Sequence, residues 1–274
     1  MTEHGTLSIA IVSGKGGVGK TNIALNLAYA LHRAKQRVLL MDCDLGLANL
    51  DVLLGIAPKI SVEQVMLGEA TLAEAAVSIE PGGFSLIPAS SGIDALGDST
   101  SPMHMSFLNQ LNAFAGGYEY LLLDVGAGIT DSVQSFAVKA AMRLVVVTPE
   151  PTSLTDAYAL IKVLASQHGI TDFHVLVNQA ESTQEEKASF TRLAAACEKF
   201  LGLTLHSLGG VRYDPTMIQA VRRQEPLLKF SPSSPAGKDL ISAAVRVHKM
   251  RETLELEPGK PLKTTDGQVA VASC

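Results

Sequence analysis

The residues of this sequence best suited to chemistry are a lysine and a threonine in a glycine-rich stretch, and three aspartates that follow apolar runs. Lys20 and Thr21 end the glycine-rich stretch, and Asp42, Asp44 and Asp124 end the apolar runs. A lysine ammonium can neutralise phosphate oxygens, a threonine hydroxyl can ligate Mg²⁺, and carboxylates can bind the metal or orient an attacking water. Together these residue types indicate phosphoryl transfer from a nucleoside triphosphate to water.

The glycine-rich stretch has the spacing of a phosphate-binding loop. It lies between the apolar run 7–12 and an amphipathic stretch, 22–33, which gives the order strand, turn and helix. Backbone N–H groups of glycines can curl around an oxyanion, and the helix N-terminus adds its own unpaired N–H groups. The complete pattern Gly-x-x-x-x-Gly-Lys-Thr favours this interpretation over a merely structural turn. The residues expected to contact the nucleotide are Gly14, Lys15, Gly16, Gly17, Val18, Gly19, Lys20 and Thr21.

The aspartates are expected to face this loop. Asp42 and Asp44 end a predicted buried strand, and side chains two residues apart lie on the same side of an extended chain. Ligands of open α/β sheets bind beyond the carboxyl ends of the strands. Mg²⁺ would relieve the repulsion between these acids and a triphosphate; the alternative is a pair of solvated loop acids. Asp124 ends the apolar run 119–123 and is expected to ligate Mg²⁺ with Thr21.

The order of the apolar runs predicts an α/β fold. Strands are expected within 7–12, 37–44, 84–89, 119–128, 143–149, 173–179 and 205–211. With helices between them, this pattern predicts a doubly wound, mostly parallel sheet of about seven or eight strands with helices on both faces. Ser61 and Thr71 are expected to cap short helices, and residues 89–102 to be mobile. We expect one domain over 1–257 and a disordered tail over 258–274.

Composition narrows the class of protein. The chain has 274 residues, 47% of them hydrophobic, and a net charge of −5, which does not favour general polyanion binding. Cys43, Cys197 and Cys274 are few and widely spaced, which fits a reducing cytosol and gives neither a disulfide framework nor a zinc site. There is no signal-peptide pattern, and no apolar run approaches the roughly 20 residues that span a bilayer. We expect a cytoplasmic protein.

The second lysine of the loop carries a family resemblance. Lys-Gly-Gly-Val-Gly-Lys-Thr, residues 15–21, resembles the deviant Walker A motif of the MinD/ParA ATPases. In that family the early lysine reaches across an ATP-sandwiched homodimer to the partner's nucleotide. The resemblance implies ATP and Mg²⁺ as cofactors, Lys15 and Lys20 as catalytic cations, Asp44 as the water-orienting acid, and Asp42 in the outer coordination sphere of Mg²⁺. A solvated loop cation is the alternative for Lys15.

Residues 148–162 resemble the FlhG/FleN (YlxH) branch, MinD-like ATPases that set flagellar number and placement. This branch implies flagellar assembly partners such as FlhF, a flagellar transcription regulator or switch-complex proteins. Only six residues precede the first expected strand, so we do not expect FlhF to be stimulated through an N-terminal extension. Asn178 stands where the superfamily contacts adenine, although a buried asparagine satisfied by the backbone would look the same. Arg212 stands where relatives more often carry Ile-Pro.

Three other functions remain open. Cell-division MinD proteins share the same chemistry. A ParA partitioning ATPase would need a basic surface for DNA, which Arg222 and Arg223 could begin. An iron–sulfur relative on the same fold would need paired cluster cysteines.

MinD-like proteins commonly end in a membrane-targeting helix, but residues 268–274 are short and weakly apolar. Membrane contact is therefore expected to be weak or transient, at the inner face of the membrane.

Overall fold

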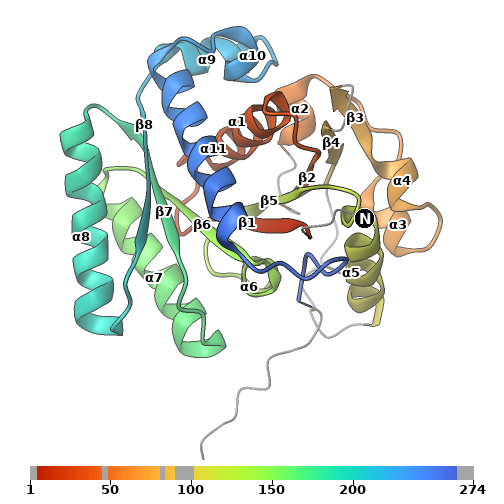
Figure 1. Ribbon diagram of the computed structural model, residues 1–274, viewed down its shortest axis with the longest axis horizontal. Coiled ribbons are helices and arrows are strands. Elements are labelled where there is room, and N and C mark those ends of the chain that lie inside the picture. Colours follow the sequence, from red (N-terminus) through yellow and green to blue (C-terminus); the bar gives the residue numbers. More distant parts are fainter. Residues whose placement is uncertain (1–4, 45–48, 81–83, 90–101, 264–274) are drawn as a thin grey trace, which may run out of the picture.

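A single mostly parallel sheet organises the fold (Figure 1). The computed structural model describes residues 5–44, 49–80, 84–89 and 102–263. Its strand order is β3-β4-β2-β5-β1-β6-β7-β8, and every described pairing is parallel except β3 with β4. The strands are β1 (Leu7–Ser13), β2 (Val38–Cys43), β3 (Val77–Glu80), β4 (Phe84–Ile87), β5 (Tyr120–Ala127), β6 (Met142–Val147), β7 (His174–Ala180) and β8 (His206–Arg212). The eight strands confirm the predicted sheet.

Helices cover both faces of the sheet (Figure 1). They are α1 (Lys20–Arg33), α2 (Leu50–Leu54), α3 (Val62–Met66), α4 (Leu72–Ala75), α5 (Pro102–Ala115), α6 (Asp131–Lys139), α7 (Pro151–His168), α8 (Thr183–Leu201), α9 (Pro215–Arg222), α10 (Leu227–Phe230) and α11 (Pro235–Thr253). One hydrophobic layer contains side chains of α1, α10 and α11, and the other contains those of α3 to α8. Because both faces are covered, the central strands are buried throughout and mostly apolar.

The two short helices α3 and α4 begin as the sequence predicts. The Ser61 hydroxyl accepts a hydrogen bond from the Gln64 backbone N–H, and the Gln64 side chain accepts one from Ser61. Thr71 and Glu74 form the same reciprocal pair at α4. Each pair satisfies backbone donors that the first helical turn leaves free, so both predicted caps are confirmed.

The packed structure extends beyond residue 257, where we expected the domain to end. Leu262 is fully buried, and its backbone exchanges two hydrogen bonds with the Asn112 side chain of α5. The backbone N–H of Lys263 donates to the carbonyl of Lys139 at 2.9 Å. Residues 258–263 therefore lie against the domain. The remainder of the expected tail, and residues 90–101 of the stretch expected to be mobile, lie outside the described residues.

Strand β3 was not expected from the sequence. It pairs antiparallel to β4 at the edge of the sheet, and its four residues are only partly buried or exposed. Such a strand lacks the continuous apolar run of the central strands.

Of the helices that the structure describes, none is long and apolar enough to cross a membrane.

Candidate nucleotide-binding site

The glycine-rich loop connects β1 to α1. Gly17 and Gly19 have φ angles of +79° and +87°, a region in which side chains with a Cβ are strained. Gly14 is required for space, since a Cβ there would lie 2.1 Å from the backbone of Asp156. No described side chain caps the first turn of α1, which begins at Lys20. The N–H groups of that turn are therefore available to an anion.

Two of the predicted acids are brought together by strand pairing. Asp42 on β2 and Asp124 on β5 are direct partners in the parallel register, and Asp124 also pairs with Ile11 of β1. Asp44 lies just past β2, with its carboxylate beside Gly126: a Cβ on that glycine would be 3.5 Å from Asp44 Oδ1. All three acids thus lie at the same edge of the sheet as the phosphate-binding loop.

The Asp42 carboxylate is held by backbone donors. Its Oδ1 accepts from the N–H of Asp44 at 3.0 Å, and its Oδ2 accepts from Asn49 at 3.1 Å and Leu50 at 3.2 Å. These bonds hold the backbone of Asp44, Asn49 and Leu50 close to the end of β2. They therefore fix the position of the Asp44 backbone. Burial, which these bonds only partly offset, raises the pKa of Asp42 to about 6.

The Asp124 carboxyl is almost completely buried, and burial raises its pKa to about 7. The Lys20 charge and a hydrogen bond with the Thr21 side chain oppose that shift, whereas the negative charge of Asp42 adds to it. Asp124 Oδ1 has no hydrogen-bond partner among the described residues. A buried carboxylate oxygen with an open position, beside a threonine hydroxyl, is a donor set that fits Mg²⁺.

The donor set is small. The described residues contain no group of three or more His, Cys, Asp or Glu that could hold a metal ion by themselves. Magnesium in nucleotide sites is commonly held by one or two protein oxygens, substrate phosphates and water. Thr21 and Asp124 could therefore hold Mg²⁺ together with a triphosphate.

The two lysines of the loop lie in different surroundings. Lys20 is 8% exposed and close enough to Asp124 to lower that carboxyl's pKa. Lys15 points to the rim of the site, with 37% of its side chain exposed. Its Nζ contacts the Glu150 carboxylate and lies 3.1 Å from the Thr152 hydroxyl. Neither contact could be predicted from local sequence patterns, because the paired residues are about 135 positions apart.

Asn178, at the end of β7, braces the phosphate-binding loop. Its Nδ2 donates to the Val18 carbonyl at 2.8 Å, and the residue is 6% exposed. This is the backbone-satisfied arrangement that the sequence left open as an alternative. The Nδ2 group would lie 2.5 Å from a Cβ on Gly19, a further reason for glycine there. Contact between Asn178 and adenine stays a prediction.

A small cavity of about 180 Å³ lies at the carboxyl ends of β7 and β8. Arg212 and Asp239 are among its lining residues, and they form an ion pair with the Arg212 Nε 2.8 Å from Asp239 Oδ2. The Arg212 backbone N–H donates to the same oxygen at 3.0 Å. Asp239 therefore holds the side chain of Arg212, which stands at the position where relatives more often carry Ile-Pro.

The glycine-rich loop between β1 and α1, with acids at the ends of two neighbouring parallel strands, defines a P-loop nucleoside triphosphate-binding fold. Residues 9–227 match a family model described as "CobQ/CobB/MinD/ParA nucleotide binding domain". Because this match spans most of the chain, the protein belongs to the MinD/ParA family.

Similarity to individual proteins supports this family assignment. The chain is 41% identical to antiactivator FleN of Pseudomonas aeruginosa over 244 residues, 89% of this chain and 87% of FleN. It is 34% identical to the flagellum site-determining protein YlxH of Helicobacter pylori over 261 residues, 94% and 88% of the two chains. The septum site-determining protein MinD of Pyrococcus horikoshii, solved with Mg-ADP, superposes with a TM-score of 0.74 at 25% identity, covering 89% and 97%. The resemblance to MinD/ParA ATPases and their FleN/YlxH branch is confirmed.

Proposed function

We propose that this protein is an ATP-dependent dimerisation switch that hydrolyses ATP to ADP and phosphate and regulates flagellar number or placement. The proposal rests on the different surroundings of the two loop lysines, Lys20 and Lys15. Lys20 is buried beside Asp124, where it can serve the chain's own nucleotide, whereas Lys15 stands at the exposed rim. A monomeric P-loop enzyme needs only the first of these cations. A second cation at the rim is suited to a nucleotide held by a second subunit.

Each remaining site residue has a role in this scheme. The backbone of residues 14–19 and the N-terminus of α1 bind the phosphates, and Lys20 neutralises the β- and γ-phosphates. Thr21 and Asp124 hold Mg²⁺, which supplies positive charge to the phosphoryl oxygens when bound. Asp44 orients the attacking water, and Asp42 holds Asp44 at the end of β2 through its backbone bond and contributes to the outer coordination sphere of the metal.

The switch follows from what each state can contact. When ATP is bound, a homodimer closes and the Lys15 ammonium of each subunit leaves Glu150 and Thr152 to meet the partner's phosphates. Closure excludes water and strengthens the interaction of Lys15 with charge that develops during phosphoryl transfer. Hydrolysis removes the γ-phosphate, so the contact that favours the dimer is lost and the subunits separate.

The names of the relatives support a flagellar role. FleN is an antiactivator and YlxH is a flagellum site-determining protein, and both align with most of this chain. The partners of the ATP-bound dimer would be flagellar assembly proteins such as FlhF, a flagellar transcription regulator or switch-complex proteins. The protein would act in the cytoplasm, with weak or transient contact at the inner face of the membrane.

Subunit mixing tests the shared active site. Lys15→Ala and Asp44→Ala are each expected to be inactive, for different reasons. In a mixed dimer, the site that keeps Asp44 receives Lys15 from the other subunit, whereas the other site lacks both groups. With equal amounts and random pairing, half of the dimers are mixed, so phosphate release should return at about a quarter of the wild-type rate. Two inactive variants that stay inactive when mixed, although native mass spectrometry detects the mixed dimer, would contradict the shared site.

Complementation tests the flagellar role. The chain would be produced in Pseudomonas aeruginosa lacking FleN, and flagella would be counted by electron microscopy. Restored flagellar number is expected for this chain and not for its Lys20→Ala variant. FleN itself is the positive control; no restoration by a stably produced chain, with FleN restoring, would contradict the flagellar assignment while leaving the ATPase assignment intact.

Septum placement is the second candidate, because a MinD septum site-determining protein shares this fold over 89% of the chain. The same production experiment separates the two functions. Restoration of septum position in cells that lack MinD, without any effect on flagella, would favour septum placement.

A further inference from the structure

A groove on the face of the molecule formed by α1, α10 and α11 is separate from the nucleotide-binding residues. It has a volume of about 680 Å³ and lies between the C-terminal half of α1 and the outer side of α11, with α10 at one end. Its floor includes the buried Tyr29, Leu228 and Ala244. Ile241 and Val245 of α11 also line the groove, and they are 42% and 49% exposed.

The spacing of these side chains suits a helix. Ile241 and Val245 are four residues apart on α11, so they lie on one side of that helix. They line the groove together with Ala30 of α1 and Ala34, which follows the last residue of α1. Small residues on one wall and exposed aliphatic residues on the other leave room for apolar side chains projecting from a third helix. An amphipathic helix presents such side chains at every third or fourth position.

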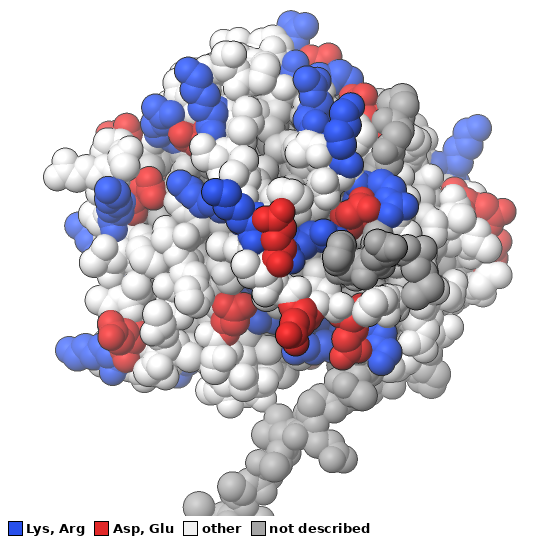
Figure 2. Space-filling view, in the orientation of Figure 1, with Lys and Arg blue, Asp and Glu red and all other residues white. Residues whose placement is uncertain are grey.

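The charges around the groove specify the partner further. Its lining contains the cations Arg33, Lys229 and Lys249 and a single carboxylate, Glu252, although the whole chain has a net charge of −5. Lys229 is paired with Glu80 at 2.8 Å, but among the described residues Arg33 and Lys249 form no ion pair. Figure 2 shows Lys and Arg side chains over this face, with Asp and Glu side chains and uncharged surface between them. Such a rim is complementary to acidic flanks.

From this geometry we propose that the α1–α11 groove binds an acidic amphipathic helix of a partner protein. The apolar stripe of that helix lies between Ala30 of α1 and Val245 of α11, and its carboxylates meet Arg33 and Lys249. The groove begins about nine residues beyond the start of α1, roughly 14 Å along the helix at 1.5 Å per residue. A bound helix would therefore leave the phosphate-binding loop accessible, so this interaction is independent of the proposed ATPase function.

The test is a selection from a displayed library of helical peptides. Anchor positions vary between Leu and Gln, and flanking positions vary between Glu and Lys. Peptides are selected on the wild-type chain and counter-selected on the double variant Val245→Asn, Lys249→Glu. Both positions are on the exposed side of α11, and an unchanged melting temperature and ATP turnover verify that the variants are folded.

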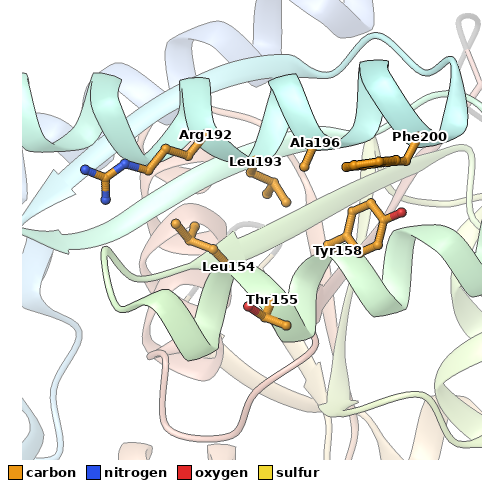
Figure 3. Close-up of a pocket in the computed structure, with 7 residues that line it drawn as sticks. All are labelled: Leu154, Thr155, Tyr158, Arg192, Leu193, Ala196 and Phe200. Carbon is orange, nitrogen blue, oxygen red and sulfur yellow. The ribbon is translucent and has the colours of Figure 1, made fainter.

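Matched controls come from a different groove. A hollow of about 440 Å³ between α7 and α8 is lined by Tyr158 and Phe200, whose rings both project into it (Figure 3). Phe200→Asn removes an exposed apolar side chain there, as Val245→Asn does on α11. Lys187→Glu reverses an exposed charge on α8, as Lys249→Glu does on α11.

The expected result is enrichment of peptides with Leu anchors and Glu flanks. Val245→Asn and Lys249→Glu should each weaken binding of an enriched peptide by roughly fivefold or more, the loss typical of one anchor residue. The charge effect should shrink at high salt. Phe200→Asn and Lys187→Glu should bind normally.

Several results would overturn the proposal. They are no enrichment over the double variant, enrichment of Lys-flanked peptides, or equal loss in the α7–α8 controls. Anionic phosphatidylglycerol vesicles would be tested in parallel. Vesicle binding that is lost in Val245→Asn, without any peptide binding, would identify the groove as a lipid contact instead.

Discussion

Asp42 on β2 and Asp124 on β5 are direct neighbours across two parallel strands, and both residues are only 1% exposed. Two carboxyls at that spacing in a buried site favour protonation, and the pKa values rise to about 6 and about 7, mainly through burial. The protein therefore maintains an unfavourable cluster of acids at the end of its central strands. A metal ion and a nucleotide would make that cluster favourable, which is typical of functional sites.

The first prediction concerns stability without nucleotide. In the folded chain, the pKa values of Asp42 and Asp124 are higher than the ordinary value of 3.8. Between that pH and the raised values, the folded state therefore binds more protons than the unfolded state. The free energy of unfolding should therefore fall as pH rises from about 4 to about 7, and stay low above that range. Asp124→Asn removes the larger contribution and should raise the free energy of unfolding at pH 8 by on the order of 2 kcal/mol.

Urea unfolding with EDTA at pH 4.5 and at pH 8 measures this difference. The gain of Asp124→Asn should be much smaller at the lower pH. Glu198→Gln, an exposed change on α8, is the control and should leave stability nearly unchanged at both pH values. A variant that is less stable than wild type at pH 8 would contradict the electrostatic account of Asp124.

The second prediction concerns Lys20. Lys20→Ala should abolish ATP binding, because it removes the cation that is fixed next to Asp124 on the chain's own phosphate site. Fluorescence titration with a labelled ATP analogue measures affinity. Lys15→Ala is the matched control, since it removes a lysine from the same loop but should keep near-normal affinity. Unchanged binding by Lys20→Ala would defeat the assignment.

The third prediction separates two roles for Asn178. Its hydrogen bond to the Val18 carbonyl braces the phosphate loop, so Asn178→Ala should weaken ATP and tripolyphosphate binding alike. The loss should be about fivefold, the effect of one hydrogen bond worth roughly 1 kcal/mol. Calorimetric titration of the two ligands measures it. A variant that loses affinity for ATP and keeps it for tripolyphosphate would show that the side chain acts on adenine.

The fourth prediction concerns Asp44. Asp44→Ala should retain ATP binding through Lys20, Thr21 and Asp124, form a longer-lived dimer, and hydrolyse ATP about 10²-fold more slowly, the scale for loss of a general base. Single-turnover hydrolysis and dimer lifetime are the two measurements. Normal turnover would move the water-orienting role to another acid, of which Asp42 is the nearest in sequence.

Much of the phosphate site could be predicted from sequence because its signals are local. The loop pattern ending at Lys20 and Thr21 occupies consecutive residues. The predicted acids end apolar strands, with Asp42 and Asp44 on one strand and Asp124 on another. The strand order and register, which the structure shows, then place Asp42 and Asp124 side by side. The caps at Ser61 and Thr71 were predictable for the same reason, since a capping residue and its partner are three positions apart.

The contacts that were not predicted are long-range. Asn178 reaches Val18 across 160 positions, and Leu262 reaches Asn112 across 150. No local pattern encodes either pair, because a buried amide is satisfied equally by many backbone groups. The contact between Lys15 and Glu150 is likewise long-range, because the two residues are 135 positions apart. Sequence indicated the chemistry proposed for the site, and the structure shows which residues hold the loop and the acids in place.

The central claim is that Lys15 acts on the nucleotide of a second subunit, and Lys15→Ala tests it most directly. Size-exclusion chromatography with ATP and Mg²⁺ is run beside a phosphate-release assay, with Lys15→Arg as a second variant. Lys15→Ala should bind ATP but remain monomeric and release no phosphate, and Lys15→Arg should recover only part, because a planar guanidinium does not replace a compact ammonium. A Lys15→Ala protein that dimerises and hydrolyses ATP normally would contradict the account.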